Sequence, residues 1–201
     1  MRVSYNGYYL SFPNWWCGFD SRYPLQGNPM NYFLLSIAIV AGYFFIVFVL
    51  LRLVAPYMGF RPYPLPVEIP GEMKSAILNL ENQTQDQNSY LEAVYRFVLG
   101  RWEHSRLKAG LLLPKLFKKD LTEIWHTKGF VYCTSINFIV YVLLAKSKYF
   151  TAQDVKIRHV FLNFVPHQYL QVRIGEKWVD VDPAGAGIRN QPLGTHASFF
   201  G

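Results

Sequence analysis

The chain has 201 residues, of which 51% are hydrophobic, and its formal net charge at pH 7 is +7. This length suits one modest domain with additional segments. The two cysteines, Cys17 and Cys133, exclude a disulfide-stapled framework, and the scattered basic residues follow no nucleic-acid-binding pattern, so we expect no nucleic-acid partner.

Residues 1–30 are rich in aromatic side chains and in turn-forming proline and glycine, and they show no sustained helical or strand period. The composition predicts an irregular N-terminal segment. Its tryptophans and tyrosines would suit the headgroup level of a membrane, whereas a poorly ordered terminus would explain the same pattern.

The next segment contains a long uncharged run, from Tyr32 to Leu51, which ends at Arg52. About 20 apolar residues in a helix are enough to cross the hydrocarbon of a bilayer, so we predict a transmembrane helix over residues 31–54. A signal peptide is disfavoured because the run starts far from Met1 and has no basic region directly before it. A core helix that is apolar on every face would need a larger protein around it.

The basic residues around this run bear on its orientation. Arg2 and Arg22 precede it, whereas Arg52, Arg61 and Lys74 follow it. This small excess after the run favours a single-pass membrane protein with its C-terminal domain in the cytoplasm.

Residues 55–71 contain five prolines, at positions 56, 62, 64, 66 and 70. Proline at this density prevents a helix and favours a semi-rigid extended linker, which would hold the globular part away from the bilayer. We place the globular domain at residues 72–201.

Two helices are predicted in the first half of that domain. Ser89 and Glu92 form a capping-box pattern before apolar residues at helical spacing, and Gly100 supplies a stop. A second apolar series over residues 136–144 predicts a buried helix that begins just after Tyr132, although its β-branched content leaves a strand possible.

Three strands are predicted in the second half, over residues 155–164, 169–174 and 177–181. Gly175 begins a two-residue connection of the type II′ kind, and Pro183 ends the last strand. Helices followed by antiparallel strands indicate an α+β fold.

The predicted hairpin brings two candidate site residues close together. A two-residue turn places His167 diagonally across from Asp182 on the same face, with backbones about 7–8 Å apart, which lets the side chains meet. Cys133 stands at the predicted helix start, where backbone N–H groups favour an anion such as a thiolate. A cysteine in such a place is also commonly a buried hydrophobe, and the residues alone leave both readings open.

Three sequence pieces together resemble the transglutaminase-like superfamily of papain-fold cysteine enzymes over residues 89–183. They are Lys128-Gly129-x-x-x-Cys133 before an apolar helix, His167-x-Tyr-Leu-x-Val, and Gly175-Glu-Lys-Trp178-Val-Asp-Val-Asp182-Pro183. The resemblance implies a transglutaminase-like core, with Cys133 as nucleophile, His167 as base and acid, and Asp182 as the group that orients the ring. It implies no metal and no cofactor.

The implied reaction is attack of a thiolate on an amide carbonyl, followed by resolution of a thioester by water or an amine. Peptidase, deamidase and amine-transfer activities would use the same three residues, on a peptide or protein substrate. Trp178 and Tyr169 are candidate substrate-binding residues, although a strand tryptophan is commonly part of a core. The alternative function is a non-catalytic binding or scaffold module at the membrane.

Other polar residues are weighed against this assignment. Asp180 shares the face of Asp182 and is the alternative orienting carboxylate. A zinc set of Cys133, His159, His167 and Asp182 is disfavoured because its spacing matches no compact motif. The remaining histidines, His104, His126 and His196, have no predicted role in the site.

Overall fold

The computed structural model describes residues 29–59, 62–162 and 165–198 of the chain. It divides into two compact units, residues 1–42 and residues 43–201, and the candidate site lies entirely in the second. The predicted irregular segment, residues 1–30, lies outside the described residues except for its last two.

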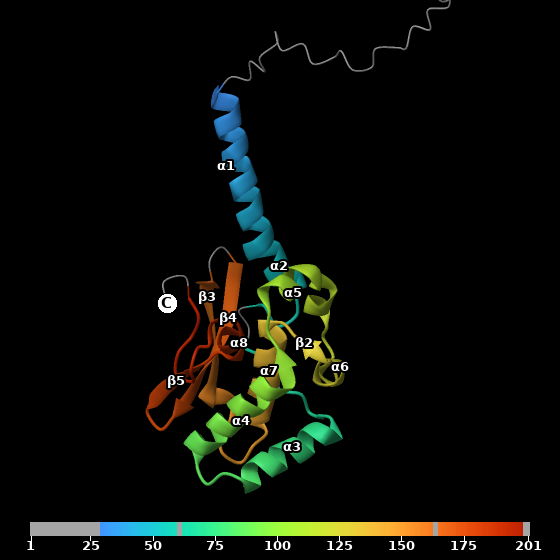
Figure 1. Ribbon diagram of the computed structural model, residues 1–201, viewed down its shortest axis with the longest axis vertical. Coiled ribbons are helices and arrows are strands. Elements are labelled where there is room, and N and C mark those ends of the chain that lie inside the picture. Colours follow the sequence, from blue (N-terminus) through green and yellow to red (C-terminus); the bar gives the residue numbers. More distant parts are fainter. Residues whose placement is uncertain (1–28, 60–61, 163–164, 199–201) are drawn as a thin grey trace, which may run out of the picture. The chain divides into compact units, whose positions relative to one another are not determined.

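Residues 29–54 are helical throughout but fall into three elements (Figure 1). They are α1, Pro29–Phe45, the π-helical η1, Ile46–Leu50, and α2, Leu51–Val54. The sequence predicts one regular membrane-crossing helix over 31–54. Among the helices that the structure describes, none combines the length and the hydropathy that a membrane crossing requires.

The proline-rich segment that follows α2, predicted as a semi-rigid extended linker, contributes buried side chains to the domain. Ala55, Met58 and Tyr63 are buried, and the ring of Tyr63 packs edge-on against Phe138 with 5.5 Å between ring centroids. Prolines fix an extended backbone here, but the aromatic side chains between them find apolar partners, so this segment joins the core of the domain.

Three helices form most of the helical layer. They are α3, Gly71–Asn82, α4, Gln87–Arg101, and α7, Cys133–Ala145. The α7 helix begins where predicted, directly after Tyr132, and its residues 134–144 are all buried. The N-cap of α4 is Asp86 rather than Ser89: the Asp86 carboxylate accepts from the Ser89 backbone, and the helix continues one residue beyond Gly100.

A group of short elements joins α4 to α7. It contains β1, Trp102–Glu103, α5, Arg106–Leu111, the 3-10 helix η2, Leu113–Phe117, α6, Leu121–Trp125, and β2, Gly129–Phe130. The β1 and β2 strands pair in parallel, with Glu103 opposite Phe130. This pairing brings the residues that follow α4 beside the residues that precede Cys133.

The second layer is an antiparallel sheet of β3, Val155–Leu162, β4, Val165–Ile174, and β5, Lys177–Val181, in the order β3-β4-β5. The short helix η3, Ala152–Asp154, precedes it and α8, Pro183–Arg189, follows it. The predicted hairpin register is confirmed: Ile174 pairs with Lys177, and Gly175 has the positive φ of 59° that its turn requires. The chain therefore has an α+β fold whose core lies between α7 and the sheet.

Candidate active site

The imidazole of His167 and the carboxylate of Asp182 form a buried pair. The distance between His167 Nε2 and Asp182 Oδ2 is 2.8 Å, and the Asp182 side chain is fully buried. The β4–β5 register produces this pair because it carries the end of β5 back beside the start of β4. The carboxylate is thus placed to hold the ring in one orientation.

Asp182 is itself held at the start of α8. Its Oδ1 accepts from the backbone N–H of Gly185 at 2.8 Å, and its Oδ2 also accepts from the N–H of Ala197 at 2.9 Å. Gly185 leaves room for this arrangement, since a Cβ at that position would lie 2.2 Å from Asp182 Oδ2. The aspartate therefore caps the helix and orients the histidine at the same time.

Cys133 is the first residue of α7, and its half-buried thiol is free. A hydrogen bond with Cys133 is among the influences on the His167 ring. The structure thus brings Cys133, His167 and Asp182 together from a helix start, a strand and a strand end. The position at a helix N-terminus favours negative charge on sulfur.

Opposing influences act on the proton affinity of His167. Burial lowers its pKa, but hydrogen bonds to Asp182 and Cys133, together with the charges of both partners, raise it to about 10. The ring is consequently protonated at neutral pH, although it is almost completely buried. A cation between a thiol and a carboxylate is the charge arrangement that an acyl-transferring cysteine site needs.

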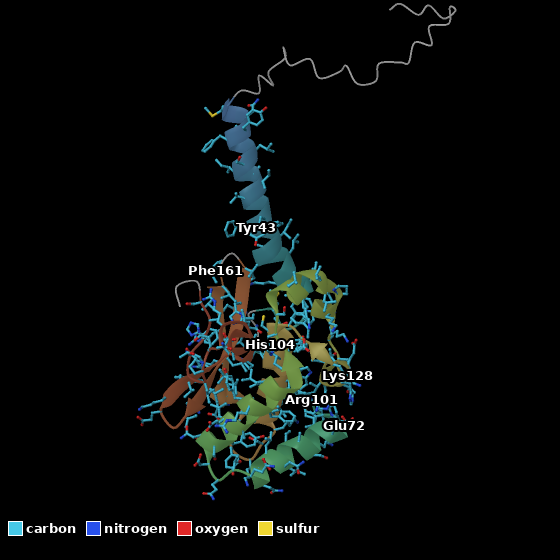
Figure 2. The ribbon with its side chains drawn as sticks, viewed as in Figure 1. Tyr43, Glu72, Arg101, His104, Lys128 and Phe161 are labelled. Atoms are coloured by element: carbon cyan, nitrogen blue, oxygen red, sulfur yellow. The ribbon has the colours of Figure 1, made fainter. Side chains whose placement is uncertain are left out.

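His104, for which the sequence predicts no role, lies near Asp182 and His167, since the charges of both act on its ring. Figure 2 shows where His104 lies in the domain. It follows β1, which lies beside β2, and the backbone of Val131 is near enough to its ring to raise its pKa. Burial lowers the pKa of His104 to about 4. The charge of His167 also lowers this pKa, whereas the Val131 backbone and the charge of Asp182 raise it. The Nε2 of His104 has no hydrogen-bond partner among the described residues. No spacing motif marks His104, because only the β1–β2 pairing brings it there.

Gln168, which follows His167 on β4, connects this strand to α7 and to the proline-rich segment. Asn137 Nδ2 donates to the Gln168 carbonyl at 2.7 Å, and Gln168 Nε2 donates to the Tyr57 carbonyl at 2.9 Å. The amide also lies 3.2 Å from His159 Nε2, and its Oε1 accepts from the Tyr63 hydroxyl. This network fixes the strand beside His167.

The zinc alternative finds no support in this geometry. His159 Nε2 lies 3.2 Å from the Gln168 amide. Within the described ranges, histidine, cysteine and acidic side chains form no cluster of three or more that could hold a metal ion.

Asp180, the alternative orienting carboxylate, binds a different histidine. Its Oδ2 lies 2.7 Å from His196 Nδ1, and its Oδ1 accepts from Gln171 at 2.8 Å. The His196 ring stacks on Tyr169 with 4.2 Å between centroids and 5° between planes. The segment that carries His196 thereby covers the sheet and delivers the Ala197 N–H to Asp182.

The two candidate substrate-binding residues have different surroundings. Tyr169 shares the strand face of His167, but it is buried and His196 covers its ring. Trp178 lies opposite Arg173 near the other end of β5, where the Lys156 ammonium sits 3.9 Å from its ring centroid. Asp182 follows Trp178 by four positions along the chain, about 13 Å in an extended strand, so Tyr169 is the nearer of the two to the buried pair.

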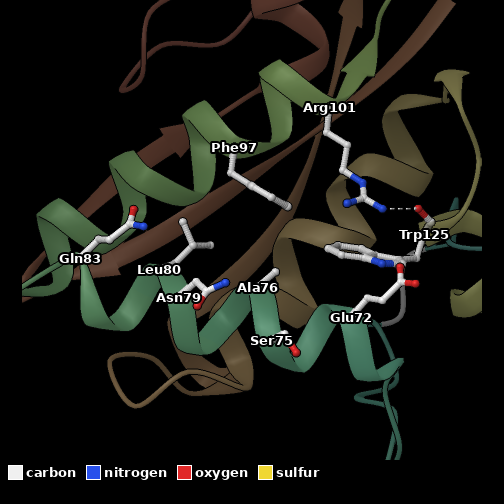
Figure 3. A pocket seen from close by; sticks show the side chains of 9 residues that line it. All are labelled: Glu72, Ser75, Ala76, Asn79, Leu80, Gln83, Phe97, Arg101 and Trp125. Atoms are coloured by element: carbon white, nitrogen blue, oxygen red, sulfur yellow. Dashed lines mark hydrogen bonds between the residues drawn. The ribbon is translucent and has the colours of Figure 1, made fainter.

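A hollow of about 460 Å³ lies elsewhere, between α3 and α4 (Figure 3). Its wall includes Phe97, Trp125 and Arg101, whose guanidinium lies 4.1 Å from the Trp125 ring centroid and donates to the Trp125 carbonyl. None of Cys133, His167 and Asp182 lines it. The hollow is therefore separate from the candidate active site.

Comparison with known proteins leaves the family open. No protein-family model matches the chain, and no curated protein matches it. Among solved structures, a chain described as "Crystal structure of a TGase" aligns with 13% identity and a TM-score of 0.45. The alignment covers 63% of this chain and 36% of the other, so this chain spans about a third of that protein's length. A similarity of this size carries no argument about activity, and the function has to be argued from the site itself.

Proposed function

We propose that the protein is a transglutaminase-like cysteine enzyme that cleaves or transfers an amide acyl group through a thioester on Cys133. One observation carries the proposal: the His167 ring lies 2.8 Å from the buried Asp182 carboxylate, and Cys133 is close enough to raise the pKa of that ring. A structural cysteine has no need of an oriented, protonated imidazole beside it.

The two ring nitrogens of His167 have different roles, one toward Asp182 and the other toward Cys133. Nε2 bonds Asp182, so Nδ1 is the nitrogen left for the thiol. The Cys133 thiolate attacks the carbonyl carbon of an amide, and the tetrahedral intermediate collapses as the Nδ1 proton passes to the departing amine. Sulfur keeps the acyl group as a thioester.

The second half of the reaction reverses these roles. Water or a primary amine attacks the thioester carbonyl and gives its proton to the neutral ring, and the sulfur leaves as a thiolate. Water yields an acid and an amine yields a new amide, so the same three residues serve hydrolysis and transfer. The proposed substrate is a peptide or a protein, and no cofactor takes part.

Membrane attachment through residues 31–54 belongs to the same proposal. It is supported by the uncharged run from Tyr32 to Leu51 and by the exposed apolar side chains of the described helices in this region. The basic residues that follow the run favour a cytoplasmic domain.

Thiol alkylation as a function of pH tests the catalytic part. In a Cys17→Ser background, Cys133 should react with iodoacetamide much faster than a model thiol at pH 6, and His167→Gln should remove that excess. His126→Gln is the matched control, because His126 is exposed and directly follows α6 as its C-cap. A reaction no faster than that of a model peptide would leave a non-catalytic module as the function. Amine incorporation against ammonia release, with Cys133→Ala as the blank, then separates transfer from hydrolysis.

A further inference from the structure

The segment between β1 and α6 exposes large apolar side chains. Leu107 and Leu111 of α5 are 73% and 72% exposed, and Leu113 and Phe117 of η2 are exposed as well. Exposed leucines at this density are unusual on a soluble surface and mark a contact site.

Two other apolar elements lie at the same end of this unit (Figure 1). The first is the end of the helical run, where Val49, Leu50, Leu53 and Val54 are exposed. The second is the β3–β4 end of the sheet, where Phe161 and Val165 are exposed; Figure 2 shows Phe161 there.

Packing and hydrogen bonds join these elements. Ala55 and Met58, directly after α2, form a small buried cluster with Leu116 of η2. The Tyr132 hydroxyl donates to the Ala109 carbonyl of α5 at 2.6 Å, and η1 contacts β4. The exposed apolar side chains therefore belong to one surface, which we call the apolar end.

Positive charge accompanies the apolar end. Residues 104–119 contain five basic residues and no acidic residue. Lys108 pairs with Glu103 and Lys118 pairs with Glu123 from just outside this segment, but these partly exposed pairs are weak in water. Alternation of leucine with lysine along a surface segment is typical of chains that lie on anionic lipid.

We infer that the apolar end rests on an anionic lipid surface, with Leu107 and Leu111 below the headgroups and the lysines among them. A lipid surface is favoured because the same unit exposes many apolar side chains of its helical run, which are Tyr43, Phe44, Phe45, Ile46, Val49, Leu50, Leu53 and Val54. Residues of the proline-rich segment, Ala55, Met58 and Tyr63, are packed into the apolar clusters of the domain, so the segment keeps the domain close to the end of that helix. The inference concerns the surface alone and does not depend on the chemistry of Cys133.

A depth-sensitive label tests the inference on the full chain in lipid nanodiscs. Leu107→Cys, in a Cys17→Ser and Cys133→Ser background, carries an NBD fluorophore, and the lipids carry bromine on their acyl chains. Glu176→Cys on the β4–β5 turn is the matched control, because the ten residues of β4 place it about 33 Å from the β3–β4 end. Leu111→Cys provides a second position, and circular dichroism verifies folding.

Bromolipid should quench the label at positions 107 and 111 and leave the label at 176 unquenched. Replacing Lys108 and Lys119 by glutamine should weaken the association with phosphatidylserine-containing discs about five-fold for each lysine, whereas replacing Lys74 and Lys177 should not. Absence of quenching at 107 and 111, or equal quenching at 176, overturns the inference. Failure of the chain to enter nanodiscs overturns it together with the proposed membrane attachment. Loss of thiol reactivity overturns only the proposed enzyme.

Discussion

Replacing Gly185 by alanine should displace the Asp182 carboxylate from its contacts in the site. A Cβ at this position would lie 2.2 Å from Asp182 Oδ2, 2.6 Å from its Cγ and 3.0 Å from the Ala197 Cβ. These atoms are buried and cannot move into solvent. The carboxylate must therefore turn away from His167, from the Ala197 N–H, or from both.

The expected cost combines two effects. Overpacking a buried site costs about 1–3 kcal/mol, and a buried hydrogen bond to a charged group contributes about 1.5–3 kcal/mol. We expect the free energy of unfolding to fall by about 3–5 kcal/mol, a large part of the stability of an ordinary domain. Gly100→Ala is the matched control: it makes the same change in a helix where nothing lies within 4 Å of the new Cβ, so it should be neutral or stabilise by up to about 1 kcal/mol.

Two measurements check this prediction. Urea unfolding gives the difference in free energy between Gly185→Ala and Gly100→Ala, and alkylation of Cys133 at pH 6 reports whether His167 still carries its proton. Wild-type stability and wild-type alkylation in Gly185→Ala would refute the argument, because they would mean that Asp182 does not need its present position to hold the ring.

Three further predictions follow from the same contacts. The raised pKa of His167 contributes stability that is complete below its ordinary value of 6.5 and is lost as pH rises to about 10, so the free energy of unfolding should decline across this window and His167→Gln should flatten the decline. His196→Ala should slow acyl transfer through kcat more than through KM, because it loosens the segment that brings Ala197 to Asp182, and His196→Gln should restore part of the rate; equal rates in all three proteins would contradict this role. Tyr63→Phe should lower the free energy of unfolding by about 1–3 kcal/mol, because it leaves the buried Gln168 Oε1 without its donor; a calorimetric scan that matches wild type would count against the Gln168 network.

The hairpin was predictable because its determinants are local. Alternating residues, a glycine at the turn and a proline after the last strand are read from neighbours in the chain, and together they place His167 across from Asp182. The start of α7 was predictable for a similar reason, since a long apolar series begins directly after Tyr132.

Two other sequence patterns, the predicted cap of α4 and the proline-rich segment, describe only part of what the structure shows. Ser89 and Glu92 suggested the cap of α4, but the helix begins three residues earlier, where the Asp86 carboxylate accepts from the Ser89 backbone N–H. Prolines predict an extended backbone over 55–71, yet they carry no information on whether Tyr63 faces water or the core. That choice depends on the apolar partners that α7 offers.

The amino-acid sequence by itself determined the α+β order of elements and the hairpin register, because periodicity and turn chemistry act over a few neighbouring residues. The chemical roles proposed for Cys133, His167 and Asp182 rest on the family resemblance as well. Only the tertiary structure decided that Asp180 binds His196, that His104 stands beside the site, and that the end of the chain holds Asp182. These relations join residues from different elements, and such contacts arise from the way that layers pack rather than from any spacing along the chain.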